Sequence, residues 1–246
     1  MRYTKLAGAA VAFCISLVPV MAYAGPNDEI SMPTVEPGER EIDFKWGSQK
    51  SADGARGTAI SLGLAYGISA WWSTEIYANY KQEPGASNSF DAWAWENRFQ
   101  LTETGRYPVD VGFMFEIERP KDQTEGYELS YGPLFQAEWG RVQGNFNLLI
   151  QKHVRGSAAF DTELHYQGQL KYRQLEQFEW GVQAFGSLGP WDHWSPSAQQ
   201  EHKFGPALFG KIRTGTGSAI KWNAALLRGS NAATRTTMRF QAEYEF

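Results

Sequence analysis

The amino-acid sequence predicts an all-β chain that closes into an antiparallel transmembrane β-barrel. Polar and apolar residues alternate over most of the chain, which is typical of strands with two different faces. After residue 24, no apolar run approaches the roughly 18 residues that a membrane-spanning helix needs. Aromatic residues make up 15% of the chain, although its mean hydropathy is only -0.45. A barrel with an apolar outside and a polar interior accounts for all three observations.

The start of the chain predicts a cleaved signal peptide over residues 1–24. Arg2 and Lys5 make the beginning positive, and an apolar stretch follows from Leu6 to Met21. Ala22-Tyr23-Ala24 has small residues at the two positions that define an export cleavage site. An uncleaved amphipathic helix or membrane anchor is the alternative. Cleavage before Gly25 would release the folded part of the chain outside the cytoplasm.

Residues 25–38 have a composition unlike the rest of the chain. The stretch GPNDEISMPTVEPG is rich in proline, glycine and acidic residues, which favours irregular backbone. We therefore expect a flexible periplasmic leader at residues 25–38. The remaining residues, 39–246, have one composition and are expected to form a single transmembrane β-barrel domain.

The last strand shows the alternation most clearly. Its apolar face consists of Met238, Phe240, Ala242, Tyr244 and Phe246, and its polar face of Arg239, Gln241, Glu243 and Glu245. In a membrane barrel the first face would meet lipid and the second the lumen. The same pattern recurs along the chain, so we expect about twelve strands. Ten or fourteen stay open, because phase breaks at Phe185 and Phe209 suggest bulges or a different assignment.

The connections between the expected strands fall into two groups. With an even strand number both termini are periplasmic. The longer, polar connections would then be external, near residues 48–56, 82–89, 119–125, 155–160, 186–200 and 229–233. The tighter ones would be periplasmic, near residues 68–71, 103–108, 140–142, 174–177 and 214–219. Aromatic residues gather at both sets of strand ends, as two membrane interfaces would select.

The inward positions carry many charged residues of both signs. The candidates for lining the lumen are Glu75, Glu96, Arg98, Asp110, Glu116, Glu138, Lys171, Arg173, Lys211, Arg239 and Glu243. Acids dominate the earlier strands and bases the later ones, so closure would set an acidic wall opposite a basic wall. Two interpretations stay open. The charges line a channel for small polar solutes, or they pair with each other, on neighbouring strands or across the lumen, in a partly plugged interior that makes the barrel rigid.

The sequence contains no pattern that defines an enzyme or a cofactor site. The four histidines, His153, His165, His193 and His202, are all expected toward the external ends. Asp192, His193 and Ser195 are neighbours in one loop, whereas the members of a catalytic triad usually meet through folding. The only cysteine, Cys14, lies in the predicted signal peptide. We therefore assign no catalytic residue and expect no metal and no cofactor. With no phosphate-binding loop and a net charge of -4, we expect no nucleic-acid partner either.

Several segments resemble a family of proteobacterial outer-membrane β-barrels. They are EREIDFKWG, LGLAYGISAWWSTEIYANY, AWENRFQLTETGRYPVDVGFMFEIERP, HKFGPALFG and FQAEYEF. The segment YGISAWWSTEIYANY also resembles the small-solute transporter barrels of aromatic-degradation operons. The ending with Tyr244 and Phe246 resembles the signal that the bacterial barrel-assembly machinery binds. The resemblance implies a fold and a location in the Gram-negative outer membrane, and it implies no catalytic residue.

Together these observations predict a monomeric, porin-like barrel that is surrounded by outer-membrane lipid. Its expected function is the passive or facilitated passage of small polar solutes, without enzymatic activity. Two alternatives stay open. One is a lipid-modifying outer-membrane enzyme with a site at the external rim. The other is a closed barrel with a structural or surface-interaction role.

Overall fold

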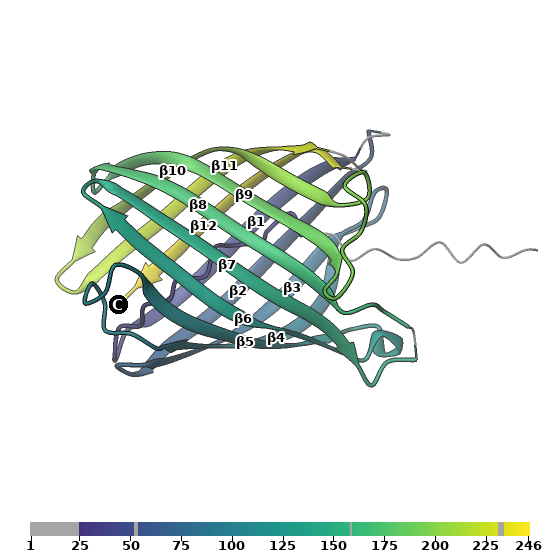
Figure 1. The fold of residues 1–246 in the computed structure, drawn as a ribbon, viewed down its shortest axis with the longest axis horizontal. Helices are drawn as coiled ribbons and strands as arrows, with labels where there is room; N and C mark the ends of the chain where they lie inside the picture. Colours follow the sequence, from purple (N-terminus) through teal and green to yellow (C-terminus); the bar gives the residue numbers. More distant parts are fainter. Residues whose placement is uncertain (1–24, 52–53, 158, 231–233) are drawn as a thin grey trace, which may run out of the picture.

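The computed structural model describes residues 25–246 apart from 52–53, 158 and 231–233. Twelve antiparallel strands form a closed barrel (Figure 1). The strands are β1 (Arg40–Ser51), β2 (Arg56–Ser69), β3 (Trp72–Gln82), β4 (Ser89–Gln100), β5 (Asp110–Pro120), β6 (Tyr127–Trp139), β7 (Val142–Val154), β8 (Glu163–Leu175), β9 (Phe178–Pro190), β10 (Glu201–Gly215), β11 (Ser218–Ser230) and β12 (Thr234–Glu245). The predicted fold class and the preferred count of twelve are confirmed, and the alternatives of ten and fourteen are wrong.

Helical structure is minimal. A short 3-10 helix, η1 (Gln123–Glu125), lies between β5 and β6. The Asp122 carboxylate caps it by accepting the Thr124 hydroxyl at 2.7 Å and the Thr124 N–H at 2.9 Å. These two hydrogen bonds lower the pKa of Asp122. No helix among the described residues has the length and apolar character needed to cross a membrane.

Closure depends on pairing between the first and last strands. β1 and β12 run antiparallel from the pair Glu41–Glu245 to the pair Ser51–Thr234. Beyond β12, the Phe246 N–H donates to the Arg40 carbonyl oxygen at 3.0 Å. The rings of Tyr244 and Phe246 stack on the outer surface with centroids 5.6 Å apart. Every strand is thus paired on both sides, and the barrel has no free edge.

The two faces of the strands follow the predicted alternation. Outward positions carry large exposed apolar side chains, of which Leu64 is 67% exposed. Inward positions carry charged side chains that are almost fully covered, such as Glu75 and Glu96. This distribution is the reverse of a soluble protein, in which charged residues are rarely buried and large apolar patches are rarely exposed.

The two ends of the barrel differ in their connections. We call the end with the start of β1 and the end of β12 the terminal end, and the opposite one the distal end. At the terminal end, β6–β7 and β10–β11 are joined by two-residue turns in which Gly140 and Gly217 have positive φ. Glycine adopts a positive φ without strain. The terminal connection between β4 and β5 is long and covers residues 101–109, and the strand connections lie where the sequence predicted them.

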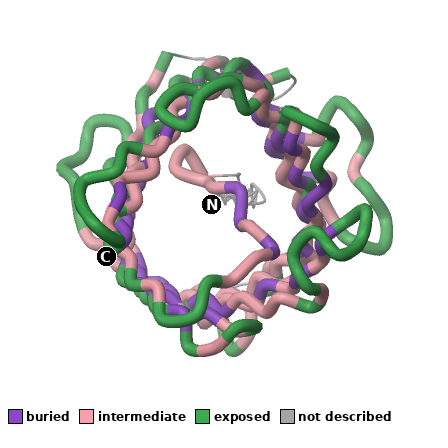
Figure 2. The backbone as a smooth tube through the Cα atoms, turned by 90° about the vertical axis from the view of Figure 1, so that its left-hand side faces the viewer, coloured by how far each residue is buried: buried purple, intermediate pink, exposed green. Residues whose placement is uncertain are grey.

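Residues 25–36 lie inside the barrel (Figure 2), whereas their composition predicted a flexible periplasmic leader at residues 25–38. We call residues 25–36 the lumen segment. It runs from the level of Gly47 in β1, past Gly112 in β5, to Gly67 at the terminal end of β2. Its composition predicted the irregular backbone. It could not predict the location, because the hydrogen bonds of this segment go to side chains of the barrel wall.

Phe185 and Phe209 do not mark bulges or misassigned strands. The register between β9 and β10 is continuous from the pair Glu201–Ser187 to the pair Phe209–Glu179. Both phenylalanines instead face the lumen and pack around Ile30 of the lumen segment. The apolar residues that interrupt the alternation in the sequence therefore contact the lumen segment inside the barrel. The predicted signal peptide, residues 1–24, lies outside the described residues.

Candidate functional site

The lumen segment separates two cavities inside the barrel. The terminal chamber has a volume of about 370 Å³ and reaches Glu36, Tyr66 and Lys221. The distal chamber has a volume of about 350 Å³ and reaches Asp91 and Glu118 on the other side of the segment. Glu29 and Ser31 line both chambers. These two residues therefore stand at the boundary between the chambers.

A buried ion pair joins the lumen segment to the barrel wall. Lys45 Nζ lies 2.5 Å from Glu29 Oε1 and 3.8 Å from Asp43 Oδ2. The Tyr77 hydroxyl donates to Glu29 Oε1 at 3.3 Å, and Gln241 Nε2 donates to Glu29 Oε2 at 2.8 Å. Lys45 also lies 3.7 Å from the centre of the Tyr77 ring. Both oxygens of Glu29 are therefore satisfied by groups on β1, β3 and β12.

Apolar contacts hold the middle of the lumen segment on two sides. Ile30 is buried against inward side chains of β9, β10 and β11, which are Phe185, Ala207, Phe209, Ala225 and Leu227. Ser31 contacts a second buried group, Met114, Leu134 and Leu149 of β5, β6 and β7, through its hydroxyl, which lies 3.5 Å from Met114 Sδ. Nearby, Asn147 Nδ2 donates to the Ser31 carbonyl oxygen at 3.0 Å. The segment thus reaches both sides of the lumen.

Glycines in the wall make room for the backbone of the lumen segment. A Cβ at Gly112 would lie 2.7 Å from Pro33 Cα, and one at Gly47 would overlap the Pro26 carbonyl group. A Cβ at Gly67 would overlap the Glu36 carbonyl oxygen. All three glycines occupy inward positions of their strands. We call Gly47, Gly67 and Gly112 the wall glycines, because any other residue there would displace the segment.

The predicted lumen residues fall into several environments. Glu75, Glu96 and Arg98 are covered near the Lys45 pair, and Arg98 Nε lies 3.3 Å from Glu96 Oε1. Glu116 lines the distal chamber and Glu243 the terminal chamber. Asp110 instead accepts the Gly105 N–H at 2.8 Å, so it stabilises a connection at the terminal end.

Lys171 pairs with an acid on the adjacent strand, whereas Arg173 and Lys211 pair with acids two strands away in the barrel order. Lys171 lies 3.1 Å from Glu179, Arg173 lies 2.6 Å from Glu138, and Lys211 lies 2.8 Å from Glu245. Arg239 donates to Gln183 at 2.7 Å and lies 4.9 Å from the centre of the Phe185 ring. These contacts join charged side chains along the wall and stiffen it.

Acidic residues outnumber lysines and arginines in the lining of both chambers. The acids of the strands that line the distal chamber are Asp91, Glu96, Glu116, Glu118 and Glu128. The terminal chamber is lined by nine acids and by five bases, which are Arg98, Lys171, Arg173, Lys211 and Lys221. Among the described residues, the distal chamber is lined by one lysine, Lys45, which is held by Glu29, and by no arginine. The distal chamber therefore has an excess of acidic groups.

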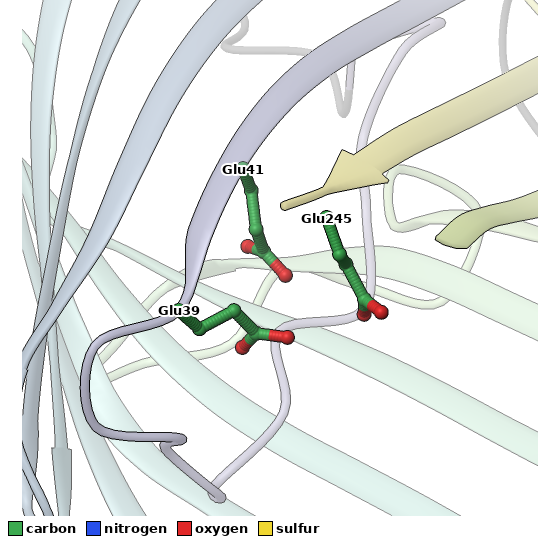
Figure 3. A group of neighbouring side chains, drawn as sticks. All are labelled: Glu39, Glu41 and Glu245. Atoms are coloured by element: carbon green, nitrogen blue, oxygen red, sulfur yellow. The ribbon is translucent and has the colours of Figure 1, made fainter. Parts of the chain in front are cut away.

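Glu39, Glu41 and Glu245 form an acidic group where β1 meets β12 (Figure 3). One carboxylate oxygen of each lies within 4.8 Å of the others, which is a spacing that a metal ion could use. Lys221 Nζ, however, lies 3.8 Å from Glu39 and 3.7 Å from Glu41, and it also contacts Glu245. Because Lys211 pairs with Glu245 as well, we interpret this group as an ion-pair network across the seam.

The histidines do not form the site that a rim-active lipid hydrolase would need. His193 contacts Asp192 at 2.7 Å, and His202 contacts the Tyr166 hydroxyl at 2.9 Å. Ser187 donates to Glu163 at 2.9 Å instead of to the nearby His165. None of these contacts is the serine-to-histidine hydrogen bond of a triad.

The sequence analysis missed the lumen segment as part of the site. Glu29 and Ile30 lie in the stretch whose composition suggested a leader. A signal for them existed in the inward apolar residues of the wall, which are Met114, Leu134, Leu149, Phe185, Phe209 and Leu227. Apolar side chains in an otherwise polar lumen require an apolar partner inside it.

Known structures resemble this chain in fold. A KdgM porin in complex with disordered oligogalacturonate aligns over 84% of this chain and 98% of its own, with 9% identity and a TM-score of 0.55. The NanC porin aligns over 83% and 98%, with 9% identity and a TM-score of 0.57. The translocator domain of autotransporter NalP from Neisseria meningitidis aligns over 86% and 89%, with 15% identity and a TM-score of 0.50.

At these identities the likeness shows the barrel fold. No protein-family model matches the chain, and no curated protein matches it in sequence. The resemblance to a proteobacterial family and to aromatic-degradation operons therefore stays a prediction.

Proposed function

We propose that this protein is an outer-membrane channel for small polar solutes. The observation that carries the proposal is a closed barrel whose interior holds two polar chambers in series, about 370 and 350 Å³ in volume. The fold that the chain shares with the KdgM and NanC porins supports this function.

The outer surface supports a location in the membrane. Exposed apolar side chains surround the barrel, among them Leu64, Ile76, Trp95, Val182 and Leu226. A soluble monomer rarely exposes a continuous apolar surface of this extent, whereas lipid requires one. We propose that the chain spans the outer membrane as a monomer, with Tyr244 and Phe246 contacting the assembly machinery.

Replacing Leu64 with arginine should destabilise the barrel by about 2–4 kcal/mol, because this position in the middle of β2 would face the hydrocarbon core. Urea unfolding in lipid vesicles measures the loss. The control is Gln82→Arg at the exposed distal end of β3, where the same side chain should cost about 0–1 kcal/mol. Equal stability of the two variants would contradict a membrane-embedded surface.

The acidic distal chamber supports a preference among solutes. Carboxylates lining a water-filled space concentrate cations and repel anions. Oligogalacturonate, with which the KdgM porin was observed, is an acidic oligosaccharide. The distal chamber of this chain disfavours such an anion, so we propose that cationic and neutral polar solutes pass.

Conductance tests the proposed function. The purified protein, inserted into planar lipid bilayers, should give discrete current steps that grow with salt concentration. Swelling of protein-containing liposomes in small neutral sugars should show passage of uncharged solutes. A correctly folded barrel that gives neither current steps nor swelling would contradict the proposal and favour a closed structural barrel.

A further inference from the structure

We infer that the lumen segment, residues 25–36, is the constriction of the channel and that Glu29 and Ser31 determine what passes it. This inference rests on the proposed function. It places the narrowest point of the channel at residues that precede the first strand, in addition to the charge preference of the distal wall.

First, the segment is fitted to the wall and does not merely occupy the lumen. The wall glycines Gly47, Gly67 and Gly112 lie where its backbone approaches most closely. Glycine in a strand interior weakens the strand, so its presence at such positions marks a close approach of another backbone. The segment contacts the wall glycines at its start, its middle and its end, through Pro26, Pro33 and Glu36.

Second, the wall has an apolar surface at the level where the lumen segment crosses the barrel interior. Phe185, Phe209 and Leu227 would face water in an empty lumen, but Ile30 covers them. Pro33 is almost fully buried as well. Exposing these surfaces to water is unfavourable, so the bound position of the segment is the stable one.

Third, Glu29 is fixed in direction. Its two oxygens are held by Lys45, Tyr77 and Gln241, which come from three different strands. A carboxylate with this many partners cannot rotate freely, so the boundary between the chambers has a defined shape and charge.

Fourth, the boundary residues belong to the segment. Glu29 and Ser31 line both the terminal and the distal chamber. A solute that moves from one chamber to the other must therefore pass the segment. The size of the opening depends on the position of the segment, and its polarity depends on the Glu29 pair and on the Ser31 hydroxyl.

The test displaces the segment without changing its own sequence. In Gly112→Ala, the new Cβ would meet Pro33, and in Gly47→Ala it would meet the Pro26 carbonyl group. The matched control is Gly168→Ala in β8, where the new Cβ would lie 3.8 Å from the Phe146 ring, which is an ordinary contact. A deletion of residues 27–36 removes the constriction altogether. Heat-modifiable gel migration shows which variants retain a folded barrel.

Two readouts follow each variant. Single-channel conductance should rise several-fold in the deletion and in Gly112→Ala, and it should stay unchanged in Gly168→Ala. A single cysteine at Ser31, in a Cys14→Ser background, reports the position of the segment through labelling by a water-soluble maleimide. Ser31 is 4% exposed, so labelling should be slow in the parent and several-fold faster in Gly112→Ala.

The outcomes separate the inference from the function on which it rests. If the parent and the deletion variant both conduct, and conduct equally, the segment is not the constriction, although the protein is still a channel. If neither of them gives current steps, the protein is not a channel. Rapid labelling of Ser31→Cys in the parent would overturn the fitted segment, whatever the conductance.

Discussion

Replacing Lys45 with methionine should release the lumen segment from the barrel wall. Lys45 and Glu29 form an ion pair in which the side chains are only 7% and 19% exposed. Removing one partner of a buried pair leaves an uncompensated charge and typically costs about 3–5 kcal/mol. Glu29 lies outside the strands, so the carboxylate can reach water if the segment moves. We therefore expect displacement of the segment rather than unfolding of the barrel.

Limited proteolysis of the protein in lipid vesicles measures this release. The segment should be cut faster in Lys45→Met, while the strands stay resistant and migration on gels stays heat-modifiable. Lys50→Met is the matched control, because Lys50 is an exposed residue of the same strand. The double variant Glu29→Gln/Lys45→Met removes both charges and should restore protection. If Lys45→Met is cut no faster than Lys50→Met, the ion pair does not hold the segment.

Neutralising the distal chamber should remove the preference for cations. Glu116 and Glu118 lie two residues apart on the inward face of β5 and line this chamber. Glu118 accepts a hydrogen bond from Asn79 at 2.8 Å, and Glu116 pairs with no base in the part of the chain that the structure describes. Charge in a confined site changes the local concentration of ions by about tenfold or more. The variant Glu116→Gln/Glu118→Gln should lose most of the cation selectivity and keep its permeability to neutral solutes.

The reversal potential in a potassium chloride gradient measures this effect. The parent should show the sign of a cation-selective channel, and the double variant should move toward zero. Glu103→Gln is the control, because Glu103 is exposed in the connection between β4 and β5 and pairs with Arg106 at 2.7 Å. An anion-selective parent, or equal shifts in the control and the double variant, would contradict a selective distal chamber.

The fold could be predicted from the sequence because its cause is local. In a strand, neighbouring side chains point to opposite faces, so consecutive residues alternate between those suited to lipid and those suited to the polar lumen. The alternation from Met238 to Glu245 and the positions of the turns were therefore sufficient to place the strands. The inward direction of residues such as Glu116 and Lys171 follows from the same period of two.

The candidate site could be predicted only in part. Asp110 and Glu116 are an even number of residues apart in one strand, so the sequence shows that they share a face. It does not show that Asp110 stabilises a connection while Glu116 lines a chamber. Nor does it show that Arg173 pairs with Glu138, because that contact depends on how β6, β7 and β8 are staggered. Both follow from register and from depth along the barrel.

By itself, the sequence determined a barrel of about twelve alternating strands, with ten and fourteen left open, a charged lumen and an apolar outside. Only the tertiary structure decided where residues 25–36 lie. That segment has no periodicity, and its position depends on contacts with residues far away in the chain, such as Ile30 with Phe209 and Glu29 with Gln241. Such contacts form only after closure brings β1, β3, β9, β10 and β12 around one lumen. In the closed barrel, Phe185 and Phe209, which interrupt the alternation in the sequence, form the apolar surface that Ile30 of the segment contacts.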